Sequence, residues 1–197
     1  MRIFLAGATG LIGTRLIPLM LADGHVVAGM TRTAGKVDEL RAAGAEPILC
    51  DLFDAEALVA AVRDFRPDVV VHQVTDLPDR LDRLAEFLPR NNRVRSEGTR
   101  NLLAAARAAN AAGFLAQSIA WRTGSGTGPV VDAHENAVIA VGGTVLRYGQ
   151  FYGPGTFYGN EPPAAPRIHV DAAARRSMPF LAGPRGIFTI TEDEATP

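Results

Sequence analysis

The chain has 197 residues, which at roughly 150 residues per domain predicts one domain with at most a small appendage. Hydrophobic residues make up 47% and charged residues 21%, so the composition is that of a soluble globular protein able to bury a core. Twenty basic residues against 21 acidic ones give a net charge of -1, which argues against binding to a nucleic-acid backbone. The single cysteine, Cys50, excludes an internal disulfide and a cysteine metal cluster, and it favours the reducing cytoplasm.

The N-terminal residues MRIFLAG are typical of a strand that enters a glycine turn, and no secretory signal pattern precedes them. No apolar run approaches the ~18 residues that a membrane-spanning helix needs. We therefore expect a small-molecule substrate as the partner of this protein, with neither a membrane nor a nucleic acid involved.

Short apolar runs alternate with helical patterns along the chain. Strands are expected at 3–6, 25–31, 47–50, 68–71, 114–120, 144–151 and 187–191, and helices at 11–22, 37–43, 55–65 and 81–112, the last interrupted near Pro89. Asp68 leads into three valines without polar alternation, which indicates a strand covered on both faces. The pattern predicts an α/β protein with a doubly wound, Rossmann-like parallel sheet and helices on both faces. We assign residues 1–152 to this domain and 153–197 to a reduced segment that packs on its substrate side.

Residues 7–13 read GATGLIG and lie between the first strand and the first helix. Gly7 allows a tight turn, Gly10 lets a pyrophosphate approach the backbone, and Gly13 lets the helix pack on the strand. The phosphates would then lie at the helix N-terminus, where free N–H groups favour anions. A glycine triplet alone is weak evidence, but here it has the strand and helix that a dinucleotide site requires.

The end of the second strand distinguishes the two nicotinamide cofactors. An acidic residue there would bind the ribose 2′-hydroxyl, whereas an arginine accommodates a 2′-phosphate. The sequence at this point has Arg32 and no carboxylate until Asp38. We therefore expect NADP(H) to be preferred over NAD(H).

Six segments in order resemble the short-chain dehydrogenase/reductase superfamily, in its extended or atypical branch, the NAD-dependent epimerase/dehydratase family. They are GATGLIG, Cys50 to Leu52, DVVVHQVT, EGTRNLLAAA, LRYGQFYGPG and IHVDAA, and they cover nearly the whole chain. The resemblance implies that Asp51 meets the adenine and that the end of the fourth strand lines the cofactor. The cofactor-binding residues expected from the motif and the resemblance together are Gly7, Thr9, Gly10, Leu11, Ile12, Gly13, Arg32, Asp51, Leu52, Gln73, Val74, Thr75, Ser118 and Tyr148. We expect any homodimer to form through the long helical region at 81–112.

The chain departs from the family at its chemistry. The family uses a Tyr-x-x-x-Lys pair, in which the tyrosine transfers a proton and the lysine lowers its pKa and holds the nicotinamide ribose. When Glu135 is aligned with the family's helix glutamate, Thr127 and Val131 occupy these two positions. Threonine is too weak an acid and valine carries no proton. Arg95 stands where the family often has an asparagine.

Three hydroxyls remain as catalytic candidates, namely Ser118, Tyr148 and Tyr152. The resemblance implies that Ser118 lies at a strand end where a hydroxyl binds the substrate carbonyl. We expect no metal site, since His134 and Glu135 lack the second histidine that a zinc helix needs. His169 and Asp171 are expected to begin a helix.

Two functions follow from these observations. The first is an NAD(P)-dependent oxidoreductase or epimerase/dehydratase-like enzyme that acts on a small carbonyl or sugar-nucleotide substrate without the usual pair. The alternative is a non-catalytic NADP(H)-binding redox sensor. The intervals 122–135 and 158–167 are shorter than the resemblance implies, so either residues are lacking from the sequence there or the protein is a truly shortened family member.

Overall fold

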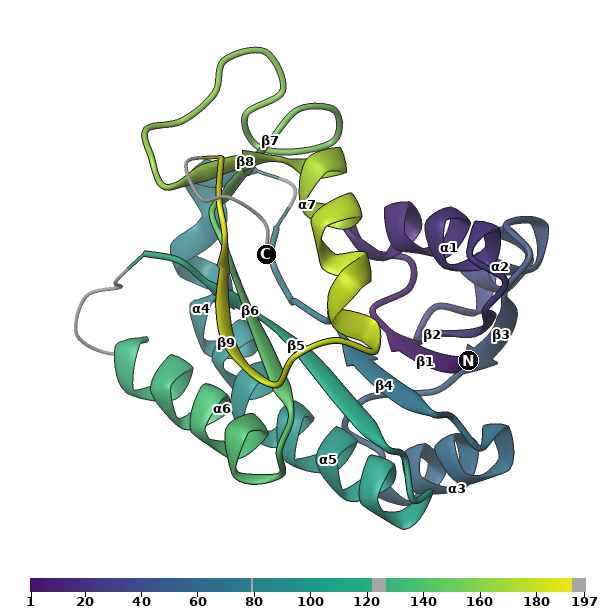
Figure 1. Ribbon diagram of the computed structural model, residues 1–197. Coiled ribbons are helices and arrows are strands. Elements are labelled where there is room, and N and C mark those ends of the chain that lie inside the picture. Colours follow the sequence, from purple (N-terminus) through teal and green to yellow (C-terminus); the bar gives the residue numbers. More distant parts are fainter. Residues whose placement is uncertain (79, 122–126, 193–197) are drawn as a thin grey trace.

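The computed structural model describes residues 1–78, 80–121 and 127–192. Its main sheet has seven strands, all parallel, in the order β3-β2-β1-β4-β5-β6-β9 (Figure 1). The strands are β1 (Arg2–Ala6), β2 (Val26–Thr31), β3 (Glu46–Leu49), β4 (Val69–His72), β5 (Gly113–Ile119), β6 (Thr144–Tyr148) and β9 (Gly186–Ile190). This arrangement confirms the predicted doubly wound, Rossmann-like α/β fold.

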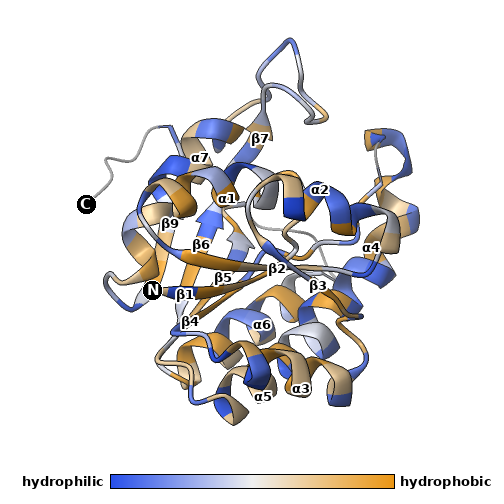
Figure 2. Ribbon diagram, turned by 90° about the vertical axis from the view of Figure 1, so that its right-hand side faces the viewer, coloured by the Kyte–Doolittle hydropathy of each residue, from blue (hydrophilic) through white to orange (hydrophobic). Residues whose placement is uncertain are grey.

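Helices cover both faces of the sheet, as Figure 2 shows from the side. One face carries α1 (Gly13–Ala22), α2 (Val37–Ala42) and α7 (Val170–Ser177), and the other carries α3 (Ala55–Phe65), α5 (Thr99–Ala108) and α6 (Gly128–Ala140). The three consecutive valines of β4 explain why both faces must be covered. Val70 belongs to the core under α3 and α5, whereas Val69 and Val71 belong to the core under α1 and α7. Each face of the sheet therefore has its own apolar core.

The long helical region differs from the prediction. Pro89 lies inside α4 (Leu84–Arg93) without ending it, and the irregularity comes later, as a π-helical turn η3 (Val94–Gly98) that leads into α5. Gly98 is required in this turn because the buried Leu52 packs on it, and an added Cβ would lie 2.5 Å from Leu52 Cδ2. A short 3₁₀ helix η2 (Leu81–Arg83) precedes α4.

The C-terminal residues are built into the main sheet. The predicted strand at 144–151 is two strands, because the chain turns at Gly149 and its second part, β7 (Gln150–Tyr152), pairs instead with β8 (Arg167–His169). The chain then forms α7, which packs on α1, and a 3₁₀ helix η4 (Met178–Leu181) before β9 pairs with β6. A further 3₁₀ helix, η1 (Ala34–Lys36), precedes α2. Within the ranges that the structure describes, no helix is long and apolar enough to cross a membrane.

Candidate active site

The predicted site residues gather where the parallel strands end. Gly7 follows β1, Arg32 follows β2, Gln73 follows β4, and Ser118 and Tyr148 lie near the ends of β5 and β6. Strands β1 and β4 are neighbours in the sheet, although the chain winds away from them in opposite directions. Ligands of doubly wound sheets bind at such a switch point, outside the carboxyl ends of the strands.

The glycine loop, residues 7–13, has the backbone geometry expected of a phosphate cradle. Gly7 has a φ of +86°, and a Cβ there would lie 2.6 Å from the backbone carbon of Gln73. A Cβ on Gly13 would overlap the carbonyl oxygens of Gly7 and Ala8. Gly10 is exposed, and a Cβ there would meet only the Gly7 carbonyl oxygen, at 3.2 Å. The loop is therefore closed by packing at Gly7 and Gly13 and open to solvent at Gly10.

This open point is the place where a pyrophosphate would approach the backbone. Leu11 and Ile12 complete the entrance to α1, and Ile12 is buried. Next to the loop, Gln73 Oε1 is buried without a hydrogen-bond partner among the described groups. An exposed glycine at a helix N-terminus and an unpaired oxygen beside it fit a dinucleotide bound at this loop.

The residues expected around the adenosine half lie at the ends of β2, β3 and β4. Arg32 is exposed, and its guanidinium lies 3.6 Å from Asp76, which also accepts a hydrogen bond from Arg90 at 3.1 Å. Thr9 Oγ1 lies 3.5 Å from Thr31 Oγ1, which joins the glycine loop to β2. The neighbouring carboxylate of Asp76 was not anticipated, and it partly neutralises the charge of Arg32.

The other predicted adenosine contacts divide by exposure. Asp51 is exposed and its side chain accepts a hydrogen bond from Phe53 N at 2.9 Å, whereas Leu52 is buried under Gly98. Val74 is half-buried and Thr75 is exposed. Asp51 and Thr75 are thus open to a ligand, and Leu52 supports the π-helical turn.

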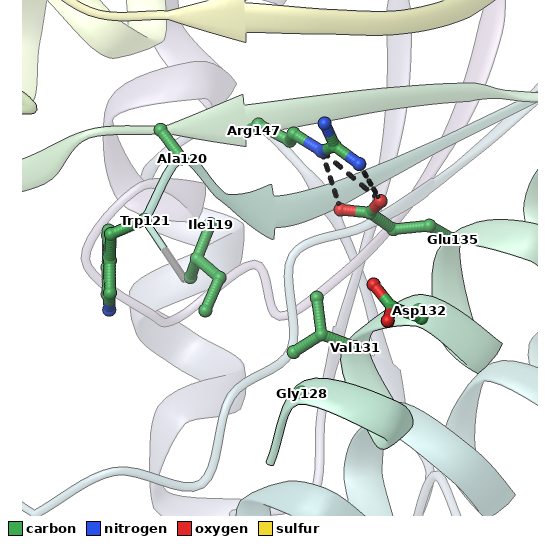
Figure 3. A pocket seen from close by; sticks show the side chains of 8 residues that line it. All are labelled: Ile119, Ala120, Trp121, Gly128, Val131, Asp132, Glu135 and Arg147. Atoms are coloured by element: carbon green, nitrogen blue, oxygen red, sulfur yellow. Dashed lines mark hydrogen bonds and ion pairs between the residues drawn. The ribbon is translucent and has the colours of Figure 1, made fainter. Parts of the chain in front are cut away.

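The hydroxyl proton of Ser118 is held in a hydrogen bond within the protein. Its hydroxyl donates to Glu135 Oε1 at 2.5 Å, and both residues are buried. Arg147 of β6 binds the same carboxylate through Nε, at 3.0 and 3.2 Å, and through Nη2 (Figure 3). Burial raises the pKa of Glu135, but the hydrogen bonds from Arg147 and Ser118 outweigh it and hold the pKa below its usual value. Glu135 is therefore an ionised acceptor, and Ser118 turns its proton away from any substrate carbonyl.

A second buried network fixes the two histidines nearest the site. Val74 N donates to His72 Nδ1 at 3.3 Å, and His72 Nε2 lies 3.2 Å from Thr99 Oγ1. Thr99 Oγ1 lies 2.8 Å from His134 Nδ1, and His134 Nε2 lies 2.9 Å from the Gln117 carbonyl oxygen. Because a carbonyl only accepts and a backbone N–H only donates, every proton in this chain has one possible place when both rings are neutral.

The pKa directions agree with neutral rings. Burial, followed by the charges of His134 and Arg95, lowers the pKa of His72 to about 3. Burial also lowers the pKa of His134. Neither imidazole is therefore available as a general acid at neutral pH.

Tyr148 lies in the core and not at the mouth of the site. Its side chain is fully buried, and Gln73 Nε2 donates to its oxygen at 3.3 Å. Its own proton goes to Ser177 Oγ at 2.7 Å, because the Ser177 hydroxyl donates to the Ala173 carbonyl oxygen. Burial raises the pKa of Tyr148. The geometry thus corrects the expectation that Tyr148 contacts the cofactor or protonates a substrate, since a residue in β6 whose side chain faces the core cannot reach either.

The hydroxyl of Tyr152 is also engaged in a hydrogen bond within the protein. Its hydroxyl donates to Glu192, and this hydrogen bond raises the pKa of the phenol. Its ring packs edge-on against His169, whose Nδ1 accepts from Asp171 N at 3.3 Å at the start of α7. His169 and Asp171 thus begin a helix, as predicted. The role of Tyr152 as a proton donor is not supported, because its proton is held by a carboxylate.

The two positions that the alignment through Glu135 assigns to the catalytic pair lie at the start of α6. Thr127 precedes the helix, and Val131 is buried beside Glu135 and Arg147. A hollow with a cavity volume of about 40 Å³ lies there, between α6 and the ends of β5 and β6 (Figure 3). This space has room for a few water molecules. Part of the interval predicted to be short, residues 122–126, lies outside the described residues.

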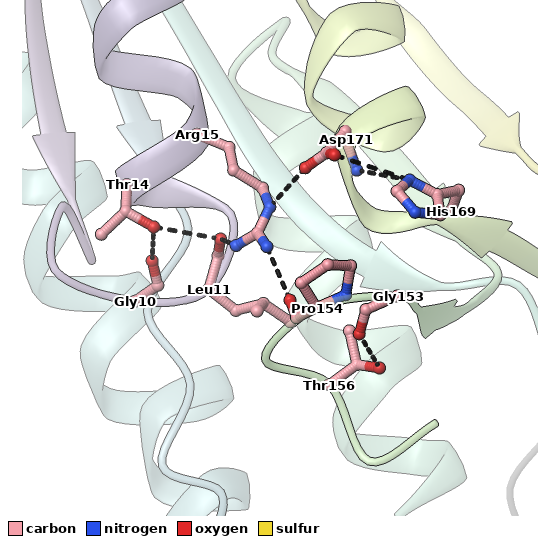
Figure 4. Close-up of polar contacts among 9 residues, drawn as sticks. All are labelled: Gly10, Leu11, Thr14, Arg15, Gly153, Pro154, Thr156, His169 and Asp171. Atoms are coloured by element: carbon pink, nitrogen blue, oxygen red, sulfur yellow. Dashed lines mark hydrogen bonds and ion pairs between the residues drawn. The ribbon is translucent and has the colours of Figure 1, made fainter. Parts of the chain in front are cut away.

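Arg15 joins the glycine loop to the C-terminal segment, a contact that the sequence did not reveal. Its Nη1 donates to the Leu11 carbonyl oxygen at 2.8 Å, and its Nη2 to the Pro154 carbonyl oxygen at 2.6 Å (Figure 4). Its Nε lies 2.7 Å from Asp171 Oδ1. One side chain therefore holds together α1, α7 and the turn after β7.

Sequence reasoning missed four residues that shape the site, and each is charged. Of the four, Arg147 could have been predicted most easily from the sequence, because a charge inside the apolar strand TVLRY requires a buried partner. The others, Arg15, Asp76 and Asp171, have ordinary surface contexts in the sequence. Among the side chains that the structure describes, no three His, Cys, Asp or Glu residues gather as a metal ion would require.

Comparison with known proteins identifies the family. The sequence profile of the NAD dependent epimerase/dehydratase family matches residues 3–121. A Streptomyces protein named 3-diazoavenalumate denitrifying reductase is 33% identical over 240 residues, which cover 100% of this chain and 78% of that protein. The chain therefore belongs to the NAD-dependent epimerase/dehydratase family.

The other relatives include sugar-nucleotide epimerases. The UDP-glucose 4-epimerase of Mycolicibacterium smegmatis is 32% identical over 114 residues, which cover 55% of this chain and 36% of that enzyme. The structure of UDP-glucose 4-epimerase from Thermus thermophilus in complex with NAD has a TM-score of 0.79 at 22% identity. It matches 98% of this chain and 78% of its own. The fold is therefore that of NAD-binding epimerases.

The alignment with the Streptomyces reductase also bears on length. It extends over 240 positions against the 197 residues of this chain, so 43 of its positions have no residue of this chain opposite them. A relative that matches this chain from end to end thus has additional internal residues.

Proposed function

We propose that this protein is a nicotinamide-dependent reductase that delivers a hydride to a substrate without a proton from a side-chain hydroxyl. One observation carries the proposal. The three candidate hydroxyls, those of Ser118, Tyr148 and Tyr152, each donate to an acceptor of the protein itself. The likeness to the Streptomyces reductase over the whole chain supports the direction of the reaction.

The same observation argues against an epimerase. An epimerase must first oxidise an alcohol, and the hydroxyl proton that leaves needs a base placed beside it. Thr127 and Val131, at the positions of the family pair, offer no such base. A reductase has the easier task, because water can supply a proton to a product oxygen after the hydride has been transferred. The missing pair therefore argues more strongly against an epimerase, which needs a base and an acid in turn, than against a reductase.

The name of the Streptomyces relative suggests a substrate class that needs no proton at all. When hydrogen replaces a diazonium group, the carbon–nitrogen bond breaks, a carbon–hydrogen bond forms and N₂ leaves, so one hydride balances the positive charge. Reduction of a small carbonyl compound leaves an oxyanion that must be protonated. We therefore propose diazo compounds as the first substrate class, ahead of small carbonyl compounds and sugar nucleotides.

The glycine loop and the ends of β2 to β4 are the residues that would hold the cofactor. Gly10 would let the pyrophosphate reach the N-terminus of α1, and Asp51 and Thr75 remain open on the adenosine side. The bound cofactor would supply the hydride. Arg32, with Arg90 close to the same carboxylate, supports a preference for NADP(H). Ser118 and Glu135 would line the reaction space from the end of β5.

The test is the oxidation of NADPH by the purified protein, followed by absorbance. Three substrates are offered in parallel, namely an aryl diazonium salt, an aromatic aldehyde and UDP-glucose. We expect NADPH consumption with the diazonium salt and formation of the dediazotised arene. The control is Gly10→Val, which should fold and lose the activity because its side chain blocks the pyrophosphate.

Interconversion of UDP-glucose with UDP-galactose would overturn the proposal, and turnover of the aldehyde alone would move the substrate class to carbonyls. Tight NADPH binding with no turnover of any substrate would favour the redox sensor. A cytoplasmic location and a homodimer through α4 and α5 stay predictions, and light scattering tests the second.

A further inference from the structure

Arg95 is a partly buried cation whose guanidinium has no counter-ion in contact. It lies in the π-helical turn η3, and its side chain forms no hydrogen bond or ion pair with any residue that the structure describes. The basic side chains around the rest of the site do have partners, Arg147 on Glu135 and Arg15 on Asp171. A desolvated cation without a partner costs stability, so it calls for an explanation.

The direction of Arg95 follows from the turn it belongs to. Thr99 comes four residues later, on the same side of the helical segment, and its hydroxyl contacts His134 of α6. Turn η3 itself packs on α6. Arg95 therefore faces α6 beside His134 and Glu135, and its charge acts on both of these residues. π-Helical turns of this kind occur frequently at functional sites.

The charges around Arg95 do not cancel. Glu135 carries one negative charge, but Arg147 binds it through two nitrogens and Ser118 donates to it as well. The two histidines are neutral, since burial lowers the pKa of each. Glu135 is the carboxylate whose charge acts on Arg95, and the three charged side chains Arg95, Glu135 and Arg147 sum to +1. Asp132, whose charge acts on Arg147, has a partner of its own. Burial lowers the pKa of Arg95 too, as expected for a cation short of a partner.

We propose that Arg95 binds the carboxylate of an anionic substrate at the end of β5, beside Ser118 and Glu135. A planar guanidinium pairs with a carboxylate through two parallel hydrogen bonds, which also fixes the orientation of the bound molecule. The reductase proposed above would then act on small organic acids. This inference rests on that proposed function.

Binding of a matched pair of ligands tests the proposal without turnover. Cinnamate and cinnamamide have nearly the same shape and differ in charge. Both are titrated against the protein with NADP⁺ present, by calorimetry and by the fluorescence of Trp121, the single tryptophan of the chain, which lies beside the hollow at Glu135. We expect the wild type to bind cinnamate roughly 10- to 100-fold more tightly than the amide. Equal affinities, or no binding of either, would overturn the proposal.

Three variants locate the preference. Arg95→Gln should bring the two affinities within about twofold, and Arg95→Lys should keep part of the preference, because a lysine retains the charge and loses the fork. Arg100→Gln makes the same change of charge on an exposed residue of α5 and should leave the preference intact. An unchanged preference in Arg95→Gln would assign the anion to another residue.

Stability separates this role from a structural one. If Arg95 awaits a ligand, Arg95→Met should raise the melting temperature by a few degrees, because it removes a desolvated charge. A structural arginine would lower it. Cofactor affinity should be unchanged in the Arg95 variants, so loss of carboxylate binding and failure of the reductase assay are separate results.

Discussion

The glycine-loop side and the α6 side of the same sheet edge have diverged to different degrees. At the glycine loop, Gly7, Gly10 and Gly13 keep the geometry that the family motif requires, and the space for a ligand is open. At α6, the positions of the catalytic pair hold Thr127 and Val131, and the buried polar groups beside them satisfy one another. The comparison teaches that this fold can keep the geometry of the glycine loop while the positions matched to the catalytic pair change.

The largest expected effect contrasts two glycines of one loop. Gly13→Ala should destabilise the protein by about 3 kcal/mol, because the new Cβ overlaps backbone oxygens that cannot move aside. Gly10→Ala should change the stability by less than about 1 kcal/mol and weaken NADPH and NADH alike. Urea denaturation and cofactor titration measure the two effects. Equal destabilisation by both changes would show that the loop is not open at Gly10.

Breaking the buried ion pair probes the α6 side. Glu135→Gln should cost about 3 kcal/mol at pH 7, because the amide has no negative charge to pair with Arg147 and offers one acceptor oxygen in place of two. The folded pKa of Glu135 lies below its unfolded value of about 4.3, so this stability is present above that pH and is lost as the pH falls through the folded pKa. Denaturation of both proteins from pH 7 to pH 3 should show the difference shrinking. A constant difference would contradict the ionised state.

Cofactor preference sharpens the comparison at the glycine-loop side. Arg32→Ala should lower the preference for NADPH over NADH by roughly 10-fold and leave NADH affinity nearly unchanged. Asp76→Asn is the matched variant, since it frees Arg32 and Arg90 from their shared carboxylate and should increase the preference. Fluorescence titration of both cofactors against the wild type and the two variants measures this preference. A wild type that binds the two cofactors equally would retire the role of Arg32.

The smallest effect is expected at Tyr152. Tyr152→Phe removes a partly exposed hydrogen bond to Glu192, so it should cost about 0.5–1 kcal/mol and leave the turnover of NADPH within twofold. Steady-state rates and thermal melts measure both quantities. A loss of rate greater than tenfold would restore Tyr152 as the proton donor.

The sequence predicted the sheet because each strand and the glycine loop carry their signal locally. The triple valine of β4 is one local pattern, and the cap of α3 by Asp54 is another, since each is formed by residues within a few positions of one another. The chemistry of the site was harder to predict, since the partners of Ser118 lie 17 and 29 positions along the chain and only the folded sheet brings them together. The π-helical turn was missed for a related reason. Pro89 is a strong local signal, whereas the packing of Leu52 on Gly98 is a tertiary contact.

The hydrogen-bond chain through His72, Thr99 and His134 runs in one direction only, so it cannot transfer protons through the interior. Moving every proton one step along it would place a proton on the Gln117 carbonyl oxygen and take one from the backbone nitrogen of Val74, and neither group exchanges protons at neutral pH. This chain of hydrogen bonds joins β4, α5 and α6 but does not transfer protons. A proton therefore does not reach the end of β5 along this chain.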